Sequence, residues 1–340
     1  MESQKKGEFP QSLLQATRYF SDIDVCVDFV AEMRWPNGVT CPHCEGQRVS
    51  YLSTRRIWKC MDKDCHKQFS VKTGSIFEDS PIALDKWLMA VWLVVNCKNG
   101  VSSYEIARDL KVTQKSAWFM LHRIRLALRK GSWEKFGGGD GSPVEVDESY
   151  VGGKTKNMHR SRKLKLAQKV GEIPSSKPVV ERYPGKTAVM GMFDRESRQV
   201  RAKVVPNVRR ETLQDEILAN IHHGSAIYSD NAVSYNKLQD KYIHETVNHL
   251  DTYVRGQVHT NSLENFWSLM KRGLHGTYVA VEPFHLDRYI DEQVFRFNNR
   301  RTPDNPLNDA DRFMLAVSQI SGKRLTYAEL TGKVGETGAF

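Results

Sequence analysis

Three acidic residues in the second half of this 340-residue chain are candidates for phosphodiester chemistry. Asp147 lies within an alternating apolar segment, Asp230 ends another, and Glu264 lies in an amphipathic one. An Asp at a strand end is more often a solvated or capping residue when taken alone, so the hypothesis depends on all three acids converging. Converging carboxylates repel one another unless divalent cations bind between them. Two Mg²⁺ or Mn²⁺ ions held there would activate a water or a 3′ hydroxyl and stabilise the leaving oxygen of a phosphodiester.

The segment around Glu264 also offers a candidate cation. Residues three, four and seven apart lie along one face of a helix, and that face here carries Asn261, Glu264 and Lys271. Glu264 and Lys271 could therefore engage metal and phosphate from one helix, with an ordinary amphipathic helix as the alternative. We expect Phe266 and Trp267 to pack in the core rather than to stack on bases.

Four of the six cysteines form a second candidate metal site. Cys41 and Cys44 make one pair, Cys60 and Cys65 make another, and fifteen residues separate the pairs. Each pair can place two thiolates on one turn, and the two turns together complete a closed tetrahedral shell around a single Zn²⁺. Because such a shell leaves no open position, we expect this zinc to be structural. Two disulfides are the alternative, which an intracellular chain disfavours.

The elements that must bring the acids together are predicted from apolar periodicity. Strand patterns cover residues 143–153, 187–193, 199–205, 225–230 and 244–248, and helical patterns cover 209–222, 233–240 and 261–270. The order is strand, strand, strand, helix, strand, helix, strand, helix, which is the RNase H topology. In this topology an acid on the first, central strand and one at the end of the neighbouring fourth strand face the same spot, and the last helix adds Glu264.

The sequence of the amino-terminal part predicts a DNA-binding region. Short strand patterns at 48–52, 56–59 and 67–71 surround the cysteine pairs and favour a zinc ribbon. Helices follow at 84–96, 103–110 and 114–130, the second opened by a Ser102/Glu105 capping box. Two helices joined by a tight turn match a helix-turn-helix, whose second helix enters the major groove, although a plain helical bundle has the same periodicity. The candidate DNA contacts on that helix are Gln114, Lys115, Arg123 and Arg125.

Charge is concentrated between Gly153 and Lys186. The chain carries a formal net charge of +10, and this segment holds ten basic residues against two acidic ones. A solvated loop is the ordinary interpretation of a charge run. Its position beside the acids instead favours a basic insertion that grips the phosphate backbone. The residues expected to do so are Arg160, Arg162, Lys163 and Lys165.

Composition and length exclude several classes of protein. Hydrophobic residues make up 40% and charged residues 26% of the chain, as in a globular protein rather than a disordered one. The longest apolar run, residues 87–95, is too short to span a bilayer, which takes roughly 20 residues, and the amino terminus lacks a secretory signal. We therefore expect no membrane partner and a cytoplasmic location, nucleoid-associated if the source is bacterial and nuclear if the element is eukaryotic.

Several motifs in one order carry a family resemblance. They include the paired cysteines, residues 117–125, 146–153 and 228–230, and the stretch from His259 to Arg272. These motifs, which extend from about Phe20 to Arg300, resemble the ISXO-like insertion-sequence transposases, a group related to the eukaryotic Merlin elements. The resemblance implies a transposase that binds the terminal inverted repeats of a mobile element and cuts and joins DNA. It also implies a metal triad of Asp147, Asp230 and Glu264 assisted by Lys271, although parts of the family carry Asn in place of the Glu, and Asn261 lies one turn away.

The sequence thus predicts an α/β protein with an RNase H-like mixed-sheet catalytic domain, preceded by a small zinc ribbon and a helix-turn-helix region. The expected boundaries are 1–80 for an N-terminal helix and the ribbon, 81–136 for the helix-turn-helix, 142–302 for the catalytic domain with its insertion at 153–186, and 303–340 for a closing helix and tail. Expected partners are double-stranded DNA, as inverted repeats and target, and further copies of the chain on DNA. A non-catalytic or domesticated DNA-binding protein and an RNase H-like structure-selective nuclease are the alternatives.

Overall fold

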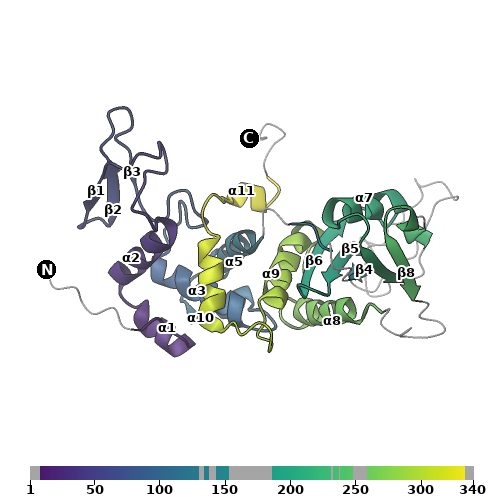
Figure 1. Ribbon diagram of the computed structural model, residues 1–340. Coiled ribbons are helices and arrows are strands. Elements are labelled where there is room, and N and C mark those ends of the chain that lie inside the picture. The colour runs from purple at the N-terminus through teal and green to yellow at the C-terminus, as the bar shows by residue number, and fades with distance from the viewer. Residues whose placement is uncertain are drawn as a thin grey trace. The chain divides into compact units, whose positions relative to one another are not determined.

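A computed structural model of the chain describes residues 8–129, 134–137, 143–152, 186–230, 233–236, 238–247 and 259–333 (Figure 1). The chain divides into two compact units. The helical unit comprises Met1–Lys130 together with Asn299–Phe340, and the sheet unit comprises Gly131–Asn298. The helical unit is therefore built from two separate parts of the sequence.

The helical unit begins with two helices and a small sheet. Helices α1 (Leu13–Tyr19) and α2 (Ile23–Arg34) precede strands β1 (Val49–Leu52), β2 (Ile57–Cys60) and β3 (Gln68–Phe69). The three strands pair in the order β1-β2-β3, and both pairings are antiparallel. This confirms the predicted three-stranded ribbon around the cysteine pairs.

Four further helices complete the helical unit. They are α3 (Leu84–Asn96), α4 (Ser103–Asp109), α5 (Gln114–Leu128) and α10 (Asp309–Ser318), with a single turn, α11 (Tyr327–Leu330), near the end. The Ser102/Glu105 capping box is present at the start of α4. Helix α10 lies in the core of the unit, since the ring of Phe313 stacks on that of Phe29 with centroids 5.7 Å apart.

The sheet unit holds a five-stranded mixed sheet. Its strands are β4 (Val144–Val151), β5 (Thr187–Asp194), β6 (Gln199–Val205), β7 (Ala226–Asp230) and β8 (Ile243–Val247). Their order is β6-β5-β4-β7-β8, with β4 in the centre. Strands β5 and β6 run antiparallel to their neighbours, whereas β7 runs parallel to β4 and β8 runs parallel to β7. This is the predicted RNase H-like topology.

Helices cover both faces of this sheet (Figure 1). Helix α7 (Arg210–Asn220) buries Leu213 and Ile217 on one face, among apolar side chains of β4, β5 and β7. Helices α8 (Asn261–Gly276) and α9 (Leu286–Asn298) cover the other face. Between β7 and β8 the predicted short helix is two single turns, η3 (Val233–Tyr235) and η4 (Leu238–Asp240), and another, η5 (Pro283–His285), precedes α9.

Helix α8 is amphipathic in the predicted sense. Phe266 and Trp267 are buried against the sheet, as expected, whereas Asn261 and Glu264 are exposed. None of the helices in the described residues is long and apolar enough to cross a membrane.

Candidate functional site

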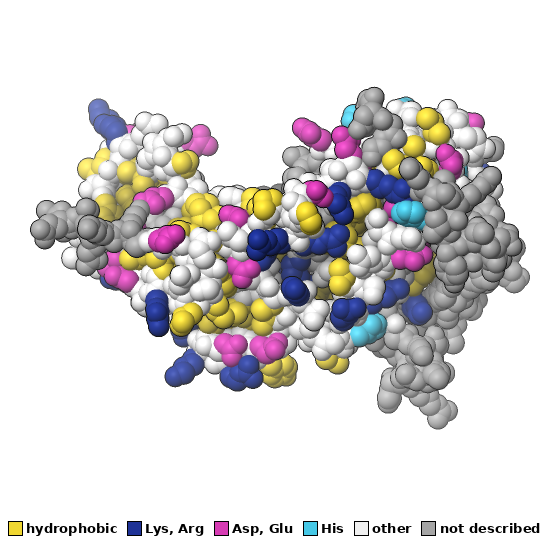
Figure 2. All heavy atoms as spheres, turned by 60° about the horizontal axis from the view of Figure 1, so that its bottom comes forward, with side chains coloured by type: hydrophobic (Ala, Val, Ile, Leu, Met, Phe, Trp, Pro, Cys, Tyr) yellow, Lys and Arg dark blue, Asp and Glu magenta, His cyan; other side chains and the backbone are white. Residues whose placement is uncertain are grey.

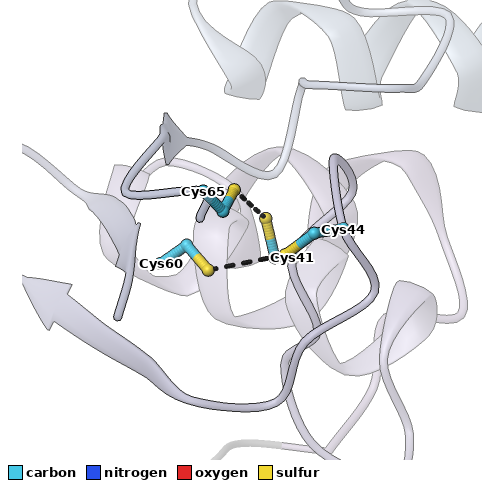
Figure 3. A group of neighbouring side chains, drawn as sticks. All are labelled: Cys41, Cys44, Cys60 and Cys65. Atoms are coloured by element: carbon cyan, nitrogen blue, oxygen red, sulfur yellow. Dashed lines mark hydrogen bonds between the residues drawn. The ribbon is translucent and has the colours of Figure 1, made fainter. Parts of the chain in front are cut away.

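The four predicted zinc ligands meet at one point of the ribbon (Figure 3). Their sulfur atoms all lie within 4.8 Å of one another. The Sγ atoms of Cys41 and Cys65 are 3.8 Å apart and those of Cys44 and Cys60 are 3.6 Å apart. A tetrahedral shell with Zn–S bonds of about 2.3 Å has S–S separations of about 3.8 Å, so the thiolates fit a single zinc ion.

The disulfide alternative does not hold for these residues. All six cysteines are free, and the sulfur separations are far longer than a disulfide bond of about 2.05 Å. His43 and His66, which flank the cysteines in the sequence, are exposed. The ribbon therefore presents a closed four-cysteine site.

The first two predicted acids lie side by side in the sheet. Strand β4 pairs with β7 in parallel, with Glu145 opposite Tyr228. Continuing this register by two residues sets Asp147 opposite Asp230, and side chains opposite each other in a sheet share a face. The predicted convergence of the first and fourth strands is therefore present in the backbone.

The third acid reaches the same region from α8. The charges of Asp230 and Glu264 both act on the carboxyl of Asp147. Burial is the largest influence on this carboxyl, and together with those two charges it raises the pKa of Asp147 to about 6, against opposing hydrogen bonds from Trp267 and the Glu148 backbone. A divalent cation would offset both the burial and the repulsion, so the site's chemistry suits one. Among the described residues, the cysteine cluster is the one group of three or more His, Cys, Asp or Glu side chains placed to hold a metal ion, and the three acids do not form such a group.

Helix α8 holds Asp147 through an indole. The Nε1–H of Trp267 donates a hydrogen bond of 2.8 Å to Oδ2 of Asp147. Gly191 lies opposite Asp147 on β5 and leaves room for that ring, because a Cβ there would come within 2.6 Å of Cζ2 of Trp267. A glycine is thus required where the Trp267 ring of α8 packs against β5.

Two further acids of β4, Glu145 and Glu148, were not predicted to have a role at this site. Glu148 points to the opposite face, where the hydroxyl of the buried Tyr235 donates a hydrogen bond to it. Burial, with the charges of Asp147 and Asp230, raises the pKa of Glu148 to about 8, so it is held protonated at neutral pH. Glu145 is fully buried, and its carboxylate accepts hydrogen bonds from backbone N–H groups at the start of α8. Nothing in the alternating strand pattern distinguishes these acids from Asp147.

The two helices predicted at 103–110 and 114–130 are present as α4 and α5. Thr113 caps α5, and both Gln114 and Lys115 are exposed in its first turn. The amide of Gln114 donates to the hydroxyl of Ser103, and the ammonium group of Lys115 lies 4.6 Å from the ring centroid of Tyr327. Both side chains remain accessible to a ligand.

The prediction that Arg123 and Arg125 contact DNA is wrong. Both side chains are buried inside the helical unit, with 6% and 0% exposure. The guanidinium of Arg123 donates to the carbonyl oxygens of Leu325, Ile76 and Glu78, so it joins segments of the unit to one another. A buried guanidinium bonded to the backbone cannot reach a base edge or a phosphate.

Other predicted DNA contacts are only partly described. Lys271 is half-buried on α8, two turns after Glu264. Arg160, Arg162, Lys163 and Lys165 lie outside the described residues. On the face of the helical unit drawn in Figure 2, Lys and Arg side chains are interspersed with acidic and hydrophobic ones. Charge alone therefore does not single out a DNA-facing surface there.

Comparisons with known proteins agree with this architecture. Residues 138–298 match the model of the ISXO2-like transposase domain, and residues 22–68 match that of a transposase zinc-ribbon domain. A Halobacterium salinarum protein, described as an uncharacterized protein in transposable element ISH50, is 30% identical over 260 residues, which cover 73% of this chain and 81% of that protein. An uncharacterized transposase-like protein of Haemophilus influenzae is 32% identical over 97 residues, which cover 28% of this chain and 78% of that protein.

A solved structure is also similar, at lower identity. A chain of the Mos1 strand transfer complex shares 12% identity, with 62% of this chain and 76% of that chain covered and a TM-score of 0.19. That score is too low to support a structural argument, so the topology above rests on the strand order. With its transposase-domain match, its zinc-ribbon match and a relative inside a transposable element, the chain belongs to the ISXO2-like transposases.

Proposed function

We propose that this transposase binds the terminal inverted repeats of its element and catalyses metal-dependent cleavage and transfer of DNA strands. Asp147, Asp230 and Glu264 would hold two Mg²⁺ or Mn²⁺ ions, with Lys271 assisting at the phosphate. The observation that carries the proposal is the parallel register that sets Asp147 opposite Asp230, with Glu264 acting electrostatically on the same carboxyl. Bound metal ions would activate the attacking oxygen and stabilise the leaving one.

Other groups of the protein would position the Asp147 carboxyl, set its dielectric environment and recognise the DNA. Burial keeps the Asp147 carboxyl in a low dielectric, where its attraction to a cation is stronger than in water. The Trp267 indole fixes one of its oxygens. The ribbon and the α4–α5 pair supply recognition of the element's ends, with Gln114 and Lys115 as the exposed candidates at the start of α5.

The decisive experiment measures Mg²⁺-dependent cleavage and strand transfer on DNA that carries the element's ends. Asp230→Ala should abolish both reactions and leave DNA binding unchanged. Asp215→Ala is the matched control, because Asp215 is an exposed acid of α7, on the other face of the sheet. Specific binding of the ends without cleavage by the wild type would favour a non-catalytic DNA-binding protein. Cleavage that ignores the end sequence would favour a structure-selective nuclease.

We further propose that the active form on DNA is a dimer or a larger assembly, since two element ends must be cut and joined together. The expected location follows the DNA, in the cytoplasm at the nucleoid of a bacterium or in the nucleus of a eukaryote. Cross-linking of the protein with and without end DNA tests the assembly. A monomer that performs strand transfer of paired ends would contradict it.

A further inference from the structure

Helix α8, which carries Glu264, begins without a cap of its own. The residue at its N-cap, Thr260, makes no side-chain hydrogen bond to the helix. Helices leave their first N–H groups without intrahelical partners, and a side chain at the N-cap normally accepts from the second or third of them. In α8 these are the N–H groups of Ser262 and Leu263.

The carboxylate of Glu145, on strand β4, accepts these hydrogen bonds in place of an N-cap side chain. Its Oε2 accepts from the Ser262 N–H at 3.0 Å and from the Leu263 N–H at 3.2 Å. An anionic acceptor suits this place because the N-terminus of a helix carries partial positive charge. The cap of α8 is therefore a residue 117 positions earlier in the sequence.

The other oxygen of Glu145 is held by Arg195. The Nε of Arg195 donates to Oε1 at 2.8 Å, and its Nη2 donates to the carbonyl oxygen of His259 at 2.8 Å. His259 directly precedes the helix, so Arg195 joins the capping carboxylate to the chain that leads into α8. Glu145 itself is 0% exposed and does not face DNA or solvent.

This cap is coupled to the acids by its place in the strand. Glu145 and Asp147 lie two residues apart on β4 and share a face. Glu264 is the residue that follows Leu263, and Trp267, less than one turn later, donates to Asp147. The strand thus fastens the helix on both sides of Glu264, at Ser262 and Leu263 and again at Trp267.

We propose that Glu145 is a positioning residue for the metal site, because it sets the separation of Glu264 from Asp147 by capping α8 from strand β4. This proposal rests on the proposed function, in which those acids bind the catalytic cations. A charge that is buried and paired contributes little net stability, so a local Ser or Asp cap would serve folding equally well. A cap placed on the strand of Asp147, in contrast, links two metal ligands directly.

The test measures metal affinity rather than turnover. Terbium, a trivalent stand-in for oxygen-liganded cations, is titrated into the zinc-loaded full chain, and its luminescence is excited through tryptophan, since Trp267 lies beside Asp147. In Glu145→Gln, one side-chain atom can no longer accept a hydrogen bond, so either Arg195 or the N–H groups of α8 lose their acceptor. The variant should weaken terbium affinity by roughly ten-fold or more, as does the loss of other residues that hold metal ligands in place. The Mg²⁺ concentration for half-maximal cleavage should rise in parallel, with DNA affinity unchanged.

Glu292→Gln is the matched control. Glu292 of α9 is also fully buried in the sheet unit, and its carboxylate accepts hydrogen bonds from Arg296 and from the hydroxyl of Tyr278. Tyr278 follows the C-terminal end of α8, so this contact lies away from the helix start that Glu145 caps. It should lower the melting temperature about as much as Glu145→Gln while leaving terbium affinity at the wild-type value. If Glu145→Gln does not fold, Arg195→Lys keeps the positive charge but loses the link to His259, and it should shift the affinity in the same direction.

The outcomes separate the two proposals. Terbium binding that is lost in Asp230→Ala but unchanged in Glu145→Gln overturns the positioning role alone. Equal affinity losses in Glu145→Gln and Glu292→Gln also overturn it, because the effect would then be one of general stability. Wild-type protein that binds no terbium at the acids, or Asp230→Ala that binds it equally well, overturns the proposed function and the positioning role together.

Discussion

Asp147 is where three different elements act on a single carboxyl group. Strand β4 carries it, α8 donates to it through Trp267, and β7 brings up the charge of Asp230. Burial and repulsion favour the protonated form, whereas the indole hydrogen bond favours the carboxylate. The balance leaves the pKa of Asp147 raised to about 6, so the folded chain disfavours the charged form of this carboxyl.

This balance predicts a pH dependence of stability for protein without added Mg²⁺. The pKa of Asp147 is raised from 3.8 to about 6 on folding, so its contribution to stability is fully present below pH 3.8 and is lost as the pH rises through about 6. Asp147→Asn carries no such group. The stability of the variant relative to the wild type should therefore rise with pH, by on the order of 3 kcal/mol in total above pH 6. Urea unfolding of both proteins across this window measures the difference, and a gap that does not change with pH would contradict the prediction.

Gly191→Ala should disable the site without touching an acid. A Cβ at this position would lie 2.6 and 2.7 Å from two ring carbons of Trp267, so the indole must shift away from Asp147. We expect a loss of strand cleavage, unchanged end binding and a destabilisation of about 1–3 kcal/mol, as for an overpacked core. Gly276→Ala in α8 is the control, since nothing lies within 4 Å of a Cβ there. Wild-type cleavage by Gly191→Ala would show that the indole contact is dispensable.

The sequence predicted the acids but not the residues that hold them. Asp147, Asp230 and Glu264 follow from strand ends and helical periodicity, which are local signals. Glu145 alternates with Asp147 in one strand, and its partner N–H groups lie more than a hundred residues away. A long-range hydrogen bond leaves no local pattern, so such a role is visible only in the folded chain.

At the scale of elements, helix α5 was predicted as a helix, but two of the DNA contacts predicted on it are buried. Its start at Gln114 and its Thr113 cap follow from the sequence, whereas it ends at Leu128 rather than at the predicted residue 130. Its second half, however, is buried on several sides, by α3 and by the C-terminal segment that brings Leu325 to Arg123. The sequence predicts DNA contacts for Arg123 and Arg125 because they lie on the second helix of a helix-turn-helix pattern, the helix that enters the major groove. The segment that buries Arg123 is 202 residues away and could not be placed from periodicity.

The two ends of α5 should therefore respond differently to substitution. Lys115→Ala should weaken binding to the element's ends and lower the salt dependence by about one counterion, as for a single phosphate contact. Arg123→Ala should instead destabilise the helical unit by about 1–3 kcal/mol, because three backbone carbonyls lose their donor. Binding isotherms at several salt concentrations and thermal melts separate the effects. A reduced salt dependence in a fully folded Arg123→Ala protein would restore that residue as a DNA contact.

At the scale of the whole molecule, the residues that follow the sheet unit in the sequence belong again to the helical unit. Residues after Asn298 pack with the first 130 residues, so the sheet unit is inserted within the helical unit. The sequence predicted the closing helix, now α10, but gave no sign of the unit in which it packs. The contacts are extensive: Phe313 packs on Phe20, Phe29 and Trp92, and the ammonium group of Lys323 donates to the carbonyl oxygens of Ala127 and Arg129. The zinc ribbon and α10 are thus parts of one unit, although about 240 residues separate them in the sequence.

This arrangement predicts that a substitution near the C-terminus weakens the N-terminal part of the chain and spares the catalytic one. Phe313 is fully buried in α10, and Phe313→Ala should destabilise the helical unit by about 3–5 kcal/mol. Calorimetry should show its transition at a lower temperature, while the transition of the sheet unit and terbium binding at the acids stay unchanged. Leu315→Ala in the same helix is the control, because that side chain is 38% exposed and should have little effect. If Phe313→Ala shifts both transitions equally, the two units unfold as one, and the C-terminal segment stabilises the catalytic region as well.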